Sequence, residues 1–257
     1  MTKDILDEND QLEKDIPIPL YFQLKEKIKE KIVNGDLEPG DLIPSERELS
    51  EKYDISRPTI RQALQGLVNE GLLYREKGRG TFVAEPKIKY GFIQKFTTFY
   101  DDMQKKGYTL KTKVISKEVK KATARIANKL NIEKDDKIIF LERLRYIEKS
   151  EPIVWVMNFL PYDLCPELIN EDLKDKSLYH ILDEKYNITY HKAEITLEPV
   201  IAEKIDSEML KIEEGSPIHL MENITYSKNG EIMDYFESRF RGDKGKVQVE
   251  LFSDNNR

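Results

Sequence analysis

Two groups of cationic side chains could do chemistry in this sequence. Arg143 and Arg145 are separated by one residue within an apolar run, and five basic residues lie between Ile55 and Val83 with only two acidic ones among them. A guanidinium group presents a fork of N–H donors that fits the oxygens of phosphate or carboxylate. The chemistry that these residue types indicate is recognition of anions, on a nucleic acid or on a small molecule.

The overall charge hides the second group. The 257 residues include 42 Lys plus Arg and 48 Asp plus Glu, a net charge of -6, which on its own argues against a nucleic-acid partner. Residues 1–16 hold two basic and six acidic side chains, and we expect them to be an acidic disordered leader. The local balance of +3 between Ile55 and Val83 is therefore the part of the chain that suits DNA.

Other function classes find little support. No apolar run approaches the roughly 20 residues that cross a bilayer, and the acidic start lacks the features of a secretory signal. The single cysteine, Cys165, excludes an intramolecular disulfide, and the three histidines provide no zinc-ligand spacing. We expect a cytoplasmic protein with no membrane partner, no metal and no cofactor.

The elements that must position the basic patch are three helices and a hairpin. Apolar residues recur at helical spacing between positions 19 and 35. Ser45 and Glu48 form a capping box that starts a second helix, and Ser56 is an N-cap for a third helix that ends near Gly71. Strands at 72–74 and 81–83 flank a Lys-Gly-Arg-Gly loop. Two helices joined by a tight turn and followed by a hairpin predict a winged helix-turn-helix.

The third helix directs its polar side chains away from the core. Its apolar stripe faces inward, so Arg57, Thr59, Arg61 and Gln62 point outward, at a helix end whose free amides already favour phosphate. Arginines there can reach base edges or backbone in the major groove. The alternative is that each arginine belongs to an ordinary solvated face.

Residues 43–83, which read IPSERELSEKYDISRPTIRQALQGLVNEGLLYREKGRGTFV, resemble the winged helix-turn-helix of GntR-family bacterial transcription regulators. The resemblance implies a homodimer on double-stranded DNA with an inverted-repeat operator. It implies contacts from helix two, the recognition helix and the wing: Arg47, Ser56, Arg57, Thr59, Arg61, Lys77, Gly78, Arg79 and Gly80.

The remainder of the chain compares with itself at an offset of 80 residues. Ten identities relate residues 114–160 to 194–240 and the apolar pattern runs in phase, which we interpret as an ancient duplication rather than chance matching of strand-rich segments. The domains expected are a winged helix-turn-helix at 17–84, a linker at 85–90 and a second domain at 91–257.

Each copy in the second domain reads as a strand, a short helix, a strand, a turn and a final strand. The helices are expected at 122–130 and 201–210, and the strands at 137–147, 152–160, 217–227 and 231–241, with turns at 148–150 and 228–230. Residues 177–186 predict a further helix between the copies. The fold class is therefore α+β, with a mixed α/β domain on a curved antiparallel sheet after the helical one.

Arg143 and Arg145 share one face of their predicted strand, about 6 to 7 Å apart, with Ile139 and Leu141. Two cations on an apolar face need a counter-charge, since burial of an unpaired charge is costly. Internal carboxylates or a bound anion could supply it. The equivalent positions of the second copy are Asn223 and Thr225, an asymmetry that favours a ligand site between the copies.

Several short motifs resemble the UTRA effector domain found in the HutC branch of the GntR family: Phe96-Thr97-Thr98-Phe99, Glu142-Arg143-Leu144-Arg145-Tyr146, Leu160-Pro161, Ser177-Leu178-Tyr179 and Arg241-Gly242-Asp243. The resemblance implies a chorismate-lyase-like fold that senses rather than catalyses. It implies that Arg143, Arg145, Ser177 and Tyr179 hold the anionic group of an effector, with a sugar phosphate as the leading candidate. Thr98, Asp234 and Phe240 fall where such sensors contact a sugar.

Three departures weaken the assignment of a sugar. Asp234 stands where Glu is usual and Phe240 where Tyr is common, and a carboxylate often present near Trp155 or Val156 is absent. The expected function is a sequence-specific transcription regulator, a repressor, whose operator affinity responds to a small anionic metabolite. The alternatives are a DNA-tethered lyase-like enzyme, for which no catalytic constellation is found, and an architectural DNA binder without a ligand.

Overall fold

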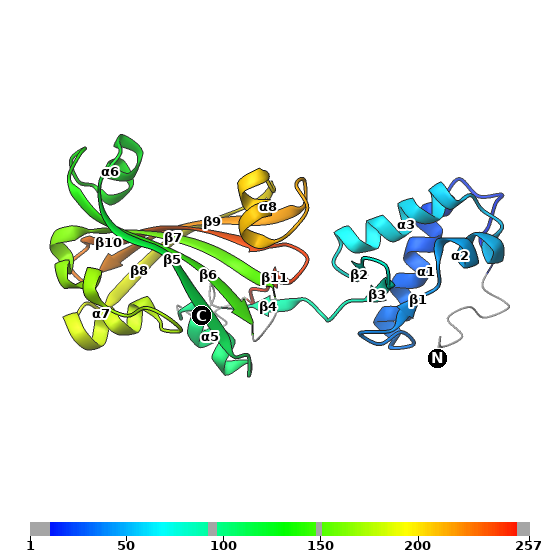
Figure 1. Cartoon of the computed structure of the whole chain (residues 1–257), viewed down its shortest axis with the longest axis horizontal. Helices are drawn as coiled ribbons and strands as arrows, with labels where there is room; N and C mark the ends of the chain where they lie inside the picture. The colour runs from blue at the N-terminus through cyan, green and yellow to red at the C-terminus, as the bar shows by residue number, and fades with distance from the viewer. Residues whose placement is uncertain (1–10, 92–96, 148–150, 251–257) are drawn as a thin grey trace, which may run out of the picture. The chain divides into compact units, whose positions relative to one another are not determined.

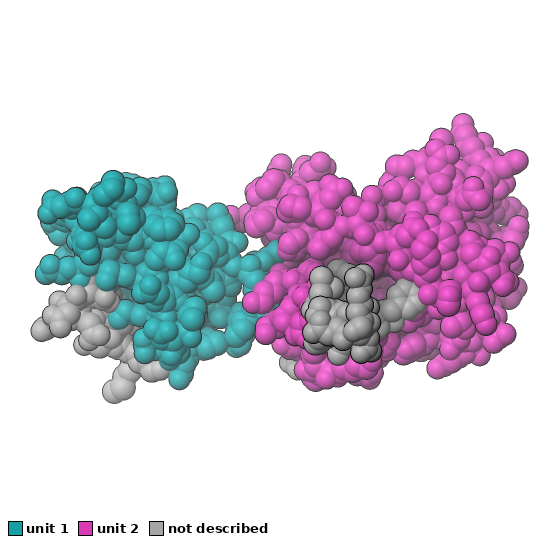
Figure 2. Space-filling model, turned by 180° about the vertical axis from the view of Figure 1, so that it is seen from behind, with its two compact units in different colours: residues 1–88, 242–244 teal, residues 89–241, 245–257 magenta. Residues whose placement is uncertain are grey.

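The computed structural model describes residues 11–91, 97–147 and 151–250 of the chain. The described residues form two compact units, the first from residues 11–88 and 242–244 and the second from the remainder (Figure 2). The predicted turn at 148–150 and Phe96 of the first short motif lie outside the described residues. Each unit has a core of its own and is described separately.

The first unit packs three helices against a small sheet. The helices are α1 (Leu20–Asn34), α2 (Glu46–Tyr53) and α3 (Arg57–Asn69), and the strands β1 (Leu42–Ile43), β2 (Leu73–Glu76) and β3 (Gly80–Val83) pair in the order β1-β3-β2. The apolar stripes meet in one core that includes Leu24, Ile28, Leu49, Ile60 and Leu64. The three helices and the hairpin are where the sequence predicts them. Strand β1 was not predicted, because two residues are too short to show a period.

Both predicted caps are present in the first unit. The Ser45 hydroxyl accepts from the Glu48 amide at 3.2 Å while the Glu48 carboxylate accepts from the Ser45 amide at 2.7 Å. The Ser56 hydroxyl accepts from the Thr59 amide, with Pro58 in the first turn of α3. These bonds satisfy donors that a helix leaves unpaired at its start.

Replacement of Ser45 by alanine should lower the free energy of unfolding of the first unit by about 1 kcal/mol, since the first-turn donors of α2 lose their acceptor. Urea unfolding followed by circular dichroism measures the change. A Ser227→Ala variant is the control, because that hydroxyl accepts backbone bonds in the turn of the second unit. Equal unfolding midpoints for the first unit in Ser45→Ala and wild type would contradict the capping role.

The predicted disordered leader is wrong for residues 11–16. Leu12 is only 9% exposed and belongs to the core of the first unit. The Glu13 backbone exchanges two hydrogen bonds of 2.9 Å with the Gln23 amide, and Lys14 lies 2.6 Å from the carboxylate of Asp54. A charge count cannot detect this packing, because Leu12 packs against residues that are distant in the sequence. Residues 1–10 lie outside the described part of the chain.

The second unit is built on a six-stranded antiparallel sheet in the order β5-β6-β7-β10-β9-β8. Figure 1 shows helices α6 and α8 on one face of this sheet and α5 and α7 on the other. The strands are β5 (Leu110–Lys121), β6 (Lys137–Ile147), β7 (Pro152–Pro161), β8 (Tyr190–Ile201), β9 (Pro217–Ser227) and β10 (Ile232–Arg241). The helices are α5 (Phe99–Lys105), α6 (Ala124–Leu130), α7 (Leu178–Tyr186) and α8 (Lys204–Leu210), with 3-10 turns at Tyr162–Leu164 and Pro166–Asn170.

The two halves of the sheet correspond residue for residue at the offset of 80 that the sequence indicates. The bounds of β5, α6, β6 and β7 become those of β8, α8, β9 and β10 when 80 is added to each number. The strand order is symmetric about the central β7–β10 pair. The predicted strands and the α+β class are therefore confirmed. Helices α6 and α8 begin two or three residues later than predicted, because each follows a longer edge strand.

Two further elements were not predicted from the sequence. The segment 85–90, expected to be a linker, contains strand β4 (Ile88–Tyr90), which pairs with β11 (Gly245–Val247). Helix α5 was not predicted either. The partner of β4 lies more than 150 residues further along the chain, so no local pattern indicates the pair.

Candidate effector pocket and DNA-binding surface

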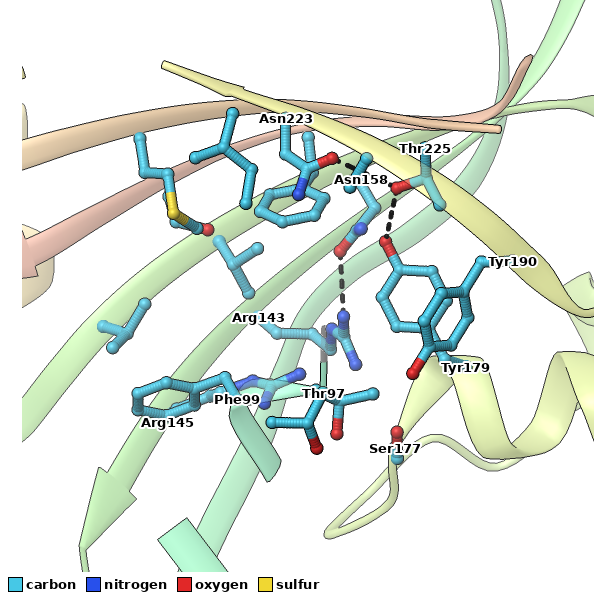
Figure 3. Close-up of a pocket in the computed structure, with 18 of the residues that line it drawn as sticks. Thr97, Phe99, Arg143, Arg145, Asn158, Ser177, Tyr179, Tyr190, Asn223 and Thr225 are labelled. Atoms are coloured by element: carbon cyan, nitrogen blue, oxygen red, sulfur yellow. Dashed lines mark hydrogen bonds between the residues drawn. The ribbon is translucent and has the colours of Figure 1, made fainter. Parts of the chain in front are cut away.

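A pocket opens on the face of the large sheet that carries α5 and α7. The empty space inside the pocket and its open mouth together, solvent included, is about 790 Å³. Figure 3 shows Arg143 and Arg145 reaching into it from β6, with Tyr179 approaching from α7. Both halves of the duplication contribute to the lining: Arg143, Arg145, Val154, Val156 and Asn158 from the first and Ala193, Ile195, Met221, Asn223, Thr225, Phe236, Ser238 and Phe240 from the second.

The two arginines are buried without a carboxylate of their own. Arg143 is 2% and Arg145 8% exposed, and neither forms an ion pair with any residue that the structure describes. Arg143 donates one bond from Nη2 to Asn158 Oδ1 at 2.8 Å, and its Nε and Nη1 have no partner there. Arg145 lies 5.6 Å from the centre of the Phe99 ring, and its Nε and Nη1 are also unsatisfied.

Burial lowers the pKa of Arg143 to about 10. Burial, together with the neighbouring charge of Arg143, lowers the pKa of Arg145 to about 9. Both guanidinium groups therefore stay charged near neutral pH. Four buried guanidinium nitrogens in the pocket have no hydrogen-bond acceptor within the described residues. Such an arrangement costs stability in the empty protein and favours a bound anion.

The start of α7 lies at the same pocket. Ser177 is the N-cap residue and is buried, but its side chain makes no capping hydrogen bond, so its hydroxyl is not used by the helix. Tyr179, two residues on, lines the pocket and places its hydroxyl 2.8 Å from Asp234 Oδ2 and 3.1 Å from Thr225 Oγ1. The positive end of the helix thus adds to the cationic character of the site.

The three residues expected near a sugar are placed differently from one another. Thr98 lines the pocket, although its hydroxyl is engaged with Asp101 as the N-cap of α5. Phe240 lines the pocket and packs against Phe99 with ring centroids 5.7 Å apart. Asp234 is fully buried behind the lining, where it accepts from Tyr179 and Asn158. The pocket brings together Thr98, Arg143, Arg145, Ser177, Tyr179 and Phe240, with Asp234 one contact away.

Several lining residues were not singled out from the sequence. Asn158, Asn223 and Thr225 supply polar groups, and Thr97, Tyr190 and Ser238 lie beside them. The offset of 80 held a signal for some of them, since Asn223 and Thr225 correspond to Arg143 and Arg145, and Ser238 corresponds to Asn158. Equivalent residues of the two copies line one pocket because the central strands β7 and β10 are neighbours.

Burial also raises the pKa of Asp234 to about 6, against the opposing effects of the Tyr179 and Asn158 hydrogen bonds and the Arg143 charge. A carboxyl whose pKa is higher in the folded than in the unfolded state makes the fold more stable when protonated. The ligand-free protein should therefore lose stability, by an amount on the order of 3 kcal/mol from this group, as pH rises from 4 to 7. Thermal unfolding across that range, in wild type and Asp234→Asn, tests this. The variant should lack that component, and identical pH profiles of the two proteins would show that Asp234 does not titrate in this way.

The basic residues predicted to contact DNA are exposed, as such contacts must be, but several of them are paired. Arg61 donates to both oxygens of Glu46, the shortest bond being 2.8 Å from Nη2, and Arg47 lies 3.2 Å from Glu51. Arg79 pairs with Glu76 and stacks over Phe82. Arg57, the first residue of α3, and Lys77 are exposed and form no ion pair with a described residue.

The wing depends on its two glycines. Gly78 and Gly80 have φ angles of 77° and 135°, a backbone that side chains disfavour, and a Cβ on Gly80 would lie 2.7 Å from a methyl of Leu42. Both glycines are exposed at the tip, where the backbone can approach a groove closely. The structure thus presents Arg57, Thr59 and Arg61 on one helix and Lys77 to Gly80 on the adjoining hairpin.

Other side chains have ordinary roles. Cys165 is buried, and burial raises its pKa to about 12, which leaves the thiol unreactive. The described residues contain no group of His, Cys, Asp and Glu arranged to hold a metal ion. Among the described helices, none is long and apolar enough to cross a membrane.

Two family models match the chain. The model for bacterial regulatory proteins of the gntR family covers residues 20–83, and the model for the UTRA domain covers residues 105–246. The two matches fall on the winged helix-turn-helix and on the large sheet respectively.

Known proteins align over nearly the full length. The HTH-type transcriptional repressor NagR of Bacillus subtilis is 37% identical over 91% of this chain and 95% of its own. The mannosyl-D-glycerate transport/metabolism system repressor MngR of Escherichia coli is 29% identical over 90% and 95%. The crystal structure of PhnF from Mycobacterium smegmatis has the same fold, with a TM-score of 0.62, 22% identity, and coverage of 90% of this chain and 99% of that one.

Proposed function

The chain belongs to the GntR family of bacterial regulatory proteins, in its UTRA-containing HutC branch, and we propose that a small anionic metabolite bound at Arg143 and Arg145 controls its affinity for DNA. The family membership makes it a DNA-binding transcriptional repressor and not an enzyme, since its relatives and fold neighbours are transcription regulators. The proposal concerns the ligand of the pocket and the effect of its binding on the affinity for DNA.

The observation that carries the proposal is the pair of buried guanidinium groups that have no carboxylate partner in the described part of the chain. A phosphate or carboxylate group placed between them would satisfy donors that the protein leaves unsatisfied, and the free amides at the start of α7 add to its stabilisation. The unused Ser177 hydroxyl completes the anion site.

The rest of the pocket supports a sugar phosphate as the ligand. Amide and hydroxyl groups of Asn223, Thr225 and Ser238 line the floor beyond the arginines, and they suit a body that carries hydroxyl groups. MngR, one of the relatives, is named for a system that handles mannosyl-D-glycerate, a sugar derivative. Apolar side chains such as Val154 and Met221 lie beside these polar groups and limit how many hydroxyls the ligand presents.

In this proposal the protein acts as a homodimer on an inverted-repeat operator. Each winged helix-turn-helix occupies one half-site, with Arg57, Thr59 and Arg61 in the major groove and the wing beside it. Ligand binding changes how the two winged helix-turn-helix domains of the dimer can be placed on the operator. A coupling free energy of about 1 to 3 kcal/mol per site would change operator affinity about 5- to 150-fold.

A thermal-shift screen of sugar phosphates, carboxylates and amino acids tests the proposal. A compound present at 100 times its dissociation constant should stabilise the protein by about 2.7 kcal/mol. The same compound should then change operator affinity in a binding titration. If every stabilising compound protects the Arg145→Met variant as well as wild type, the pocket is not the effector site.

A further inference from the structure

Among the residues that the structure describes, Asp234 is the fully buried carboxyl group that is hydrogen-bonded to the anion site. It is 0% exposed and lies at the start of β10, opposite Thr225 in the strand register. Its Oδ2 accepts from Asn158 Nδ2 and from the Tyr179 hydroxyl, both at 2.8 Å. The carboxyl group therefore contacts two residues that line the pocket and lies behind them.

The hydrogen bonds around Asn158 can have only one direction. Its side-chain oxygen accepts from Arg143 Nη2 at 2.8 Å, and its nitrogen donates to Asp234 at 2.8 Å. A guanidinium group cannot accept a hydrogen bond, and a carboxylate cannot donate one. If the Asn158 amide were rotated by 180°, its NH2 group would face the donor of Arg143 and its oxygen would face the acceptor of Asp234. Asp234 thus fixes the amide, and the amide fixes one edge of Arg143, which leaves Nε and Nη1 as the donors for a ligand (Figure 3).

The same carboxyl group determines what Tyr179 can do. A phenol has a single O–H, and in the structure it lies within 2.8 Å of the carboxylate, with Thr225 Oγ1 as a second neighbour at 3.1 Å. Burial and the Asp234 charge raise the pKa of Tyr179, so the phenol keeps its proton. With that proton directed to Asp234, the ring is held at the wall of the pocket.

We propose that Asp234 is a positioning residue, which orders Arg143 through Asn158 and holds Tyr179 directly, and does not contact the ligand itself. The proposal rests on the anion site proposed above and changes the role of one residue, since the family resemblance implies that this position touches the sugar. Its physical basis is that a buried, charged acceptor orients two donors more strongly than a neutral one, at a cost in stability.

Two substitutions of Asp234 separate charge from hydrogen bonding. Asp234→Asn keeps an acceptor oxygen but removes the charge, and Asp234→Leu removes both at similar volume. With inorganic phosphate as the probe of the full-length protein, we expect a dissociation constant a few fold higher for Asn and about tenfold or more higher for Leu. The melting temperature at pH 7 should not fall for Asn, whereas a purely structural role predicts that it falls.

Asp206 provides the matched control. It is a buried carboxyl of α8, part of a capping box, and lies 2.8 Å from Arg239 on the opposite face of the sheet. Asp206→Asn and Asp206→Leu should lower the melting temperature and leave phosphate affinity unchanged. Phosphate affinity equal to wild type in both Asp234 variants would overturn the proposal.

A measurement without ligand keeps the inference independent of the proposed function. In two-dimensional spectra of arginine side chains, the Nε–H signal of Arg143, assigned with Arg143→Met, should shift and broaden in Asp234→Leu and not in Asp206→Leu. An unchanged Arg143 signal in Asp234→Leu would refute the positioning role even if phosphate did not bind. Absence of phosphate binding in wild type, with a changed signal, would count against the proposed anion site and support the positioning role.

Discussion

The Arg143→Met variant should lose its response to the effector while it still binds the operator. The substitution keeps most of the buried volume and removes the charge, so the ligand's anionic group faces one arginine instead of two. Removal of one partner from a buried charge pair costs about 2 to 5 kcal/mol, which corresponds to about 30-fold or more in effector affinity. Calorimetric titration measures the affinity for the effector. Operator titration with and without the effector measures operator affinity and its response.

Arg239→Met is the control for that variant. Arg239 also lies on a central strand and stacks over Trp155, with ring and guanidinium 5.6 Å apart, but on the face of the sheet opposite the pocket. Its replacement should leave the response intact. The ligand-free Arg143→Met protein should melt no lower than wild type, because a buried cation without an ion-pair partner is removed. An unchanged effector response in Arg143→Met would remove the site.

The second large effect is expected at the recognition helix. Arg57→Ala should weaken operator binding by about 1 to 3 kcal/mol per half-site, and the proposed dimer would occupy two half-sites. Arg57 opens α3, is exposed and has no carboxylate partner among the described residues, so it can engage DNA without first breaking an ion pair. Arg61 must leave Glu46 to do the same, so we expect a smaller loss for Arg61→Ala.

Fluorescence anisotropy with labelled operator measures these losses, and a salt titration shows whether the contact is to phosphate, since each lost phosphate contact lowers the salt slope by about 1. Stabilisation by the effector should persist in Arg57→Ala. Lys134→Ala, an exposed cation of the second unit, is the control and should bind operator as wild type does. Loss of effector binding in Arg57→Ala would contradict the division of roles between the units.

Local signals in the sequence predicted much of the fold. The caps at Ser45 and Ser56 place the starts of α2 and α3, because a helix start is decided by hydrogen bonds within four residues. The offset of 80 relates four elements of the first copy to four of the second, because duplicated segments keep their apolar period. By contrast, the burial of Leu12 and the pairing of β4 with β11 depend on contacts between distant segments, which no local pattern shows.

The sequence by itself determined the strand face that Arg143 and Arg145 share, since a period of two places alternate residues together. It also predicted two kinds of anion recognition. It left open whether internal carboxylates neutralise the two arginines. Only the tertiary structure decided this, by placing Asn158 against Arg143 and the buried carboxyl of Asp234 one residue further away. Spacing along a strand determines the face of the sheet on which a side chain lies. The partner of a charged side chain is set by the register of neighbouring strands and by the helix that packs over them.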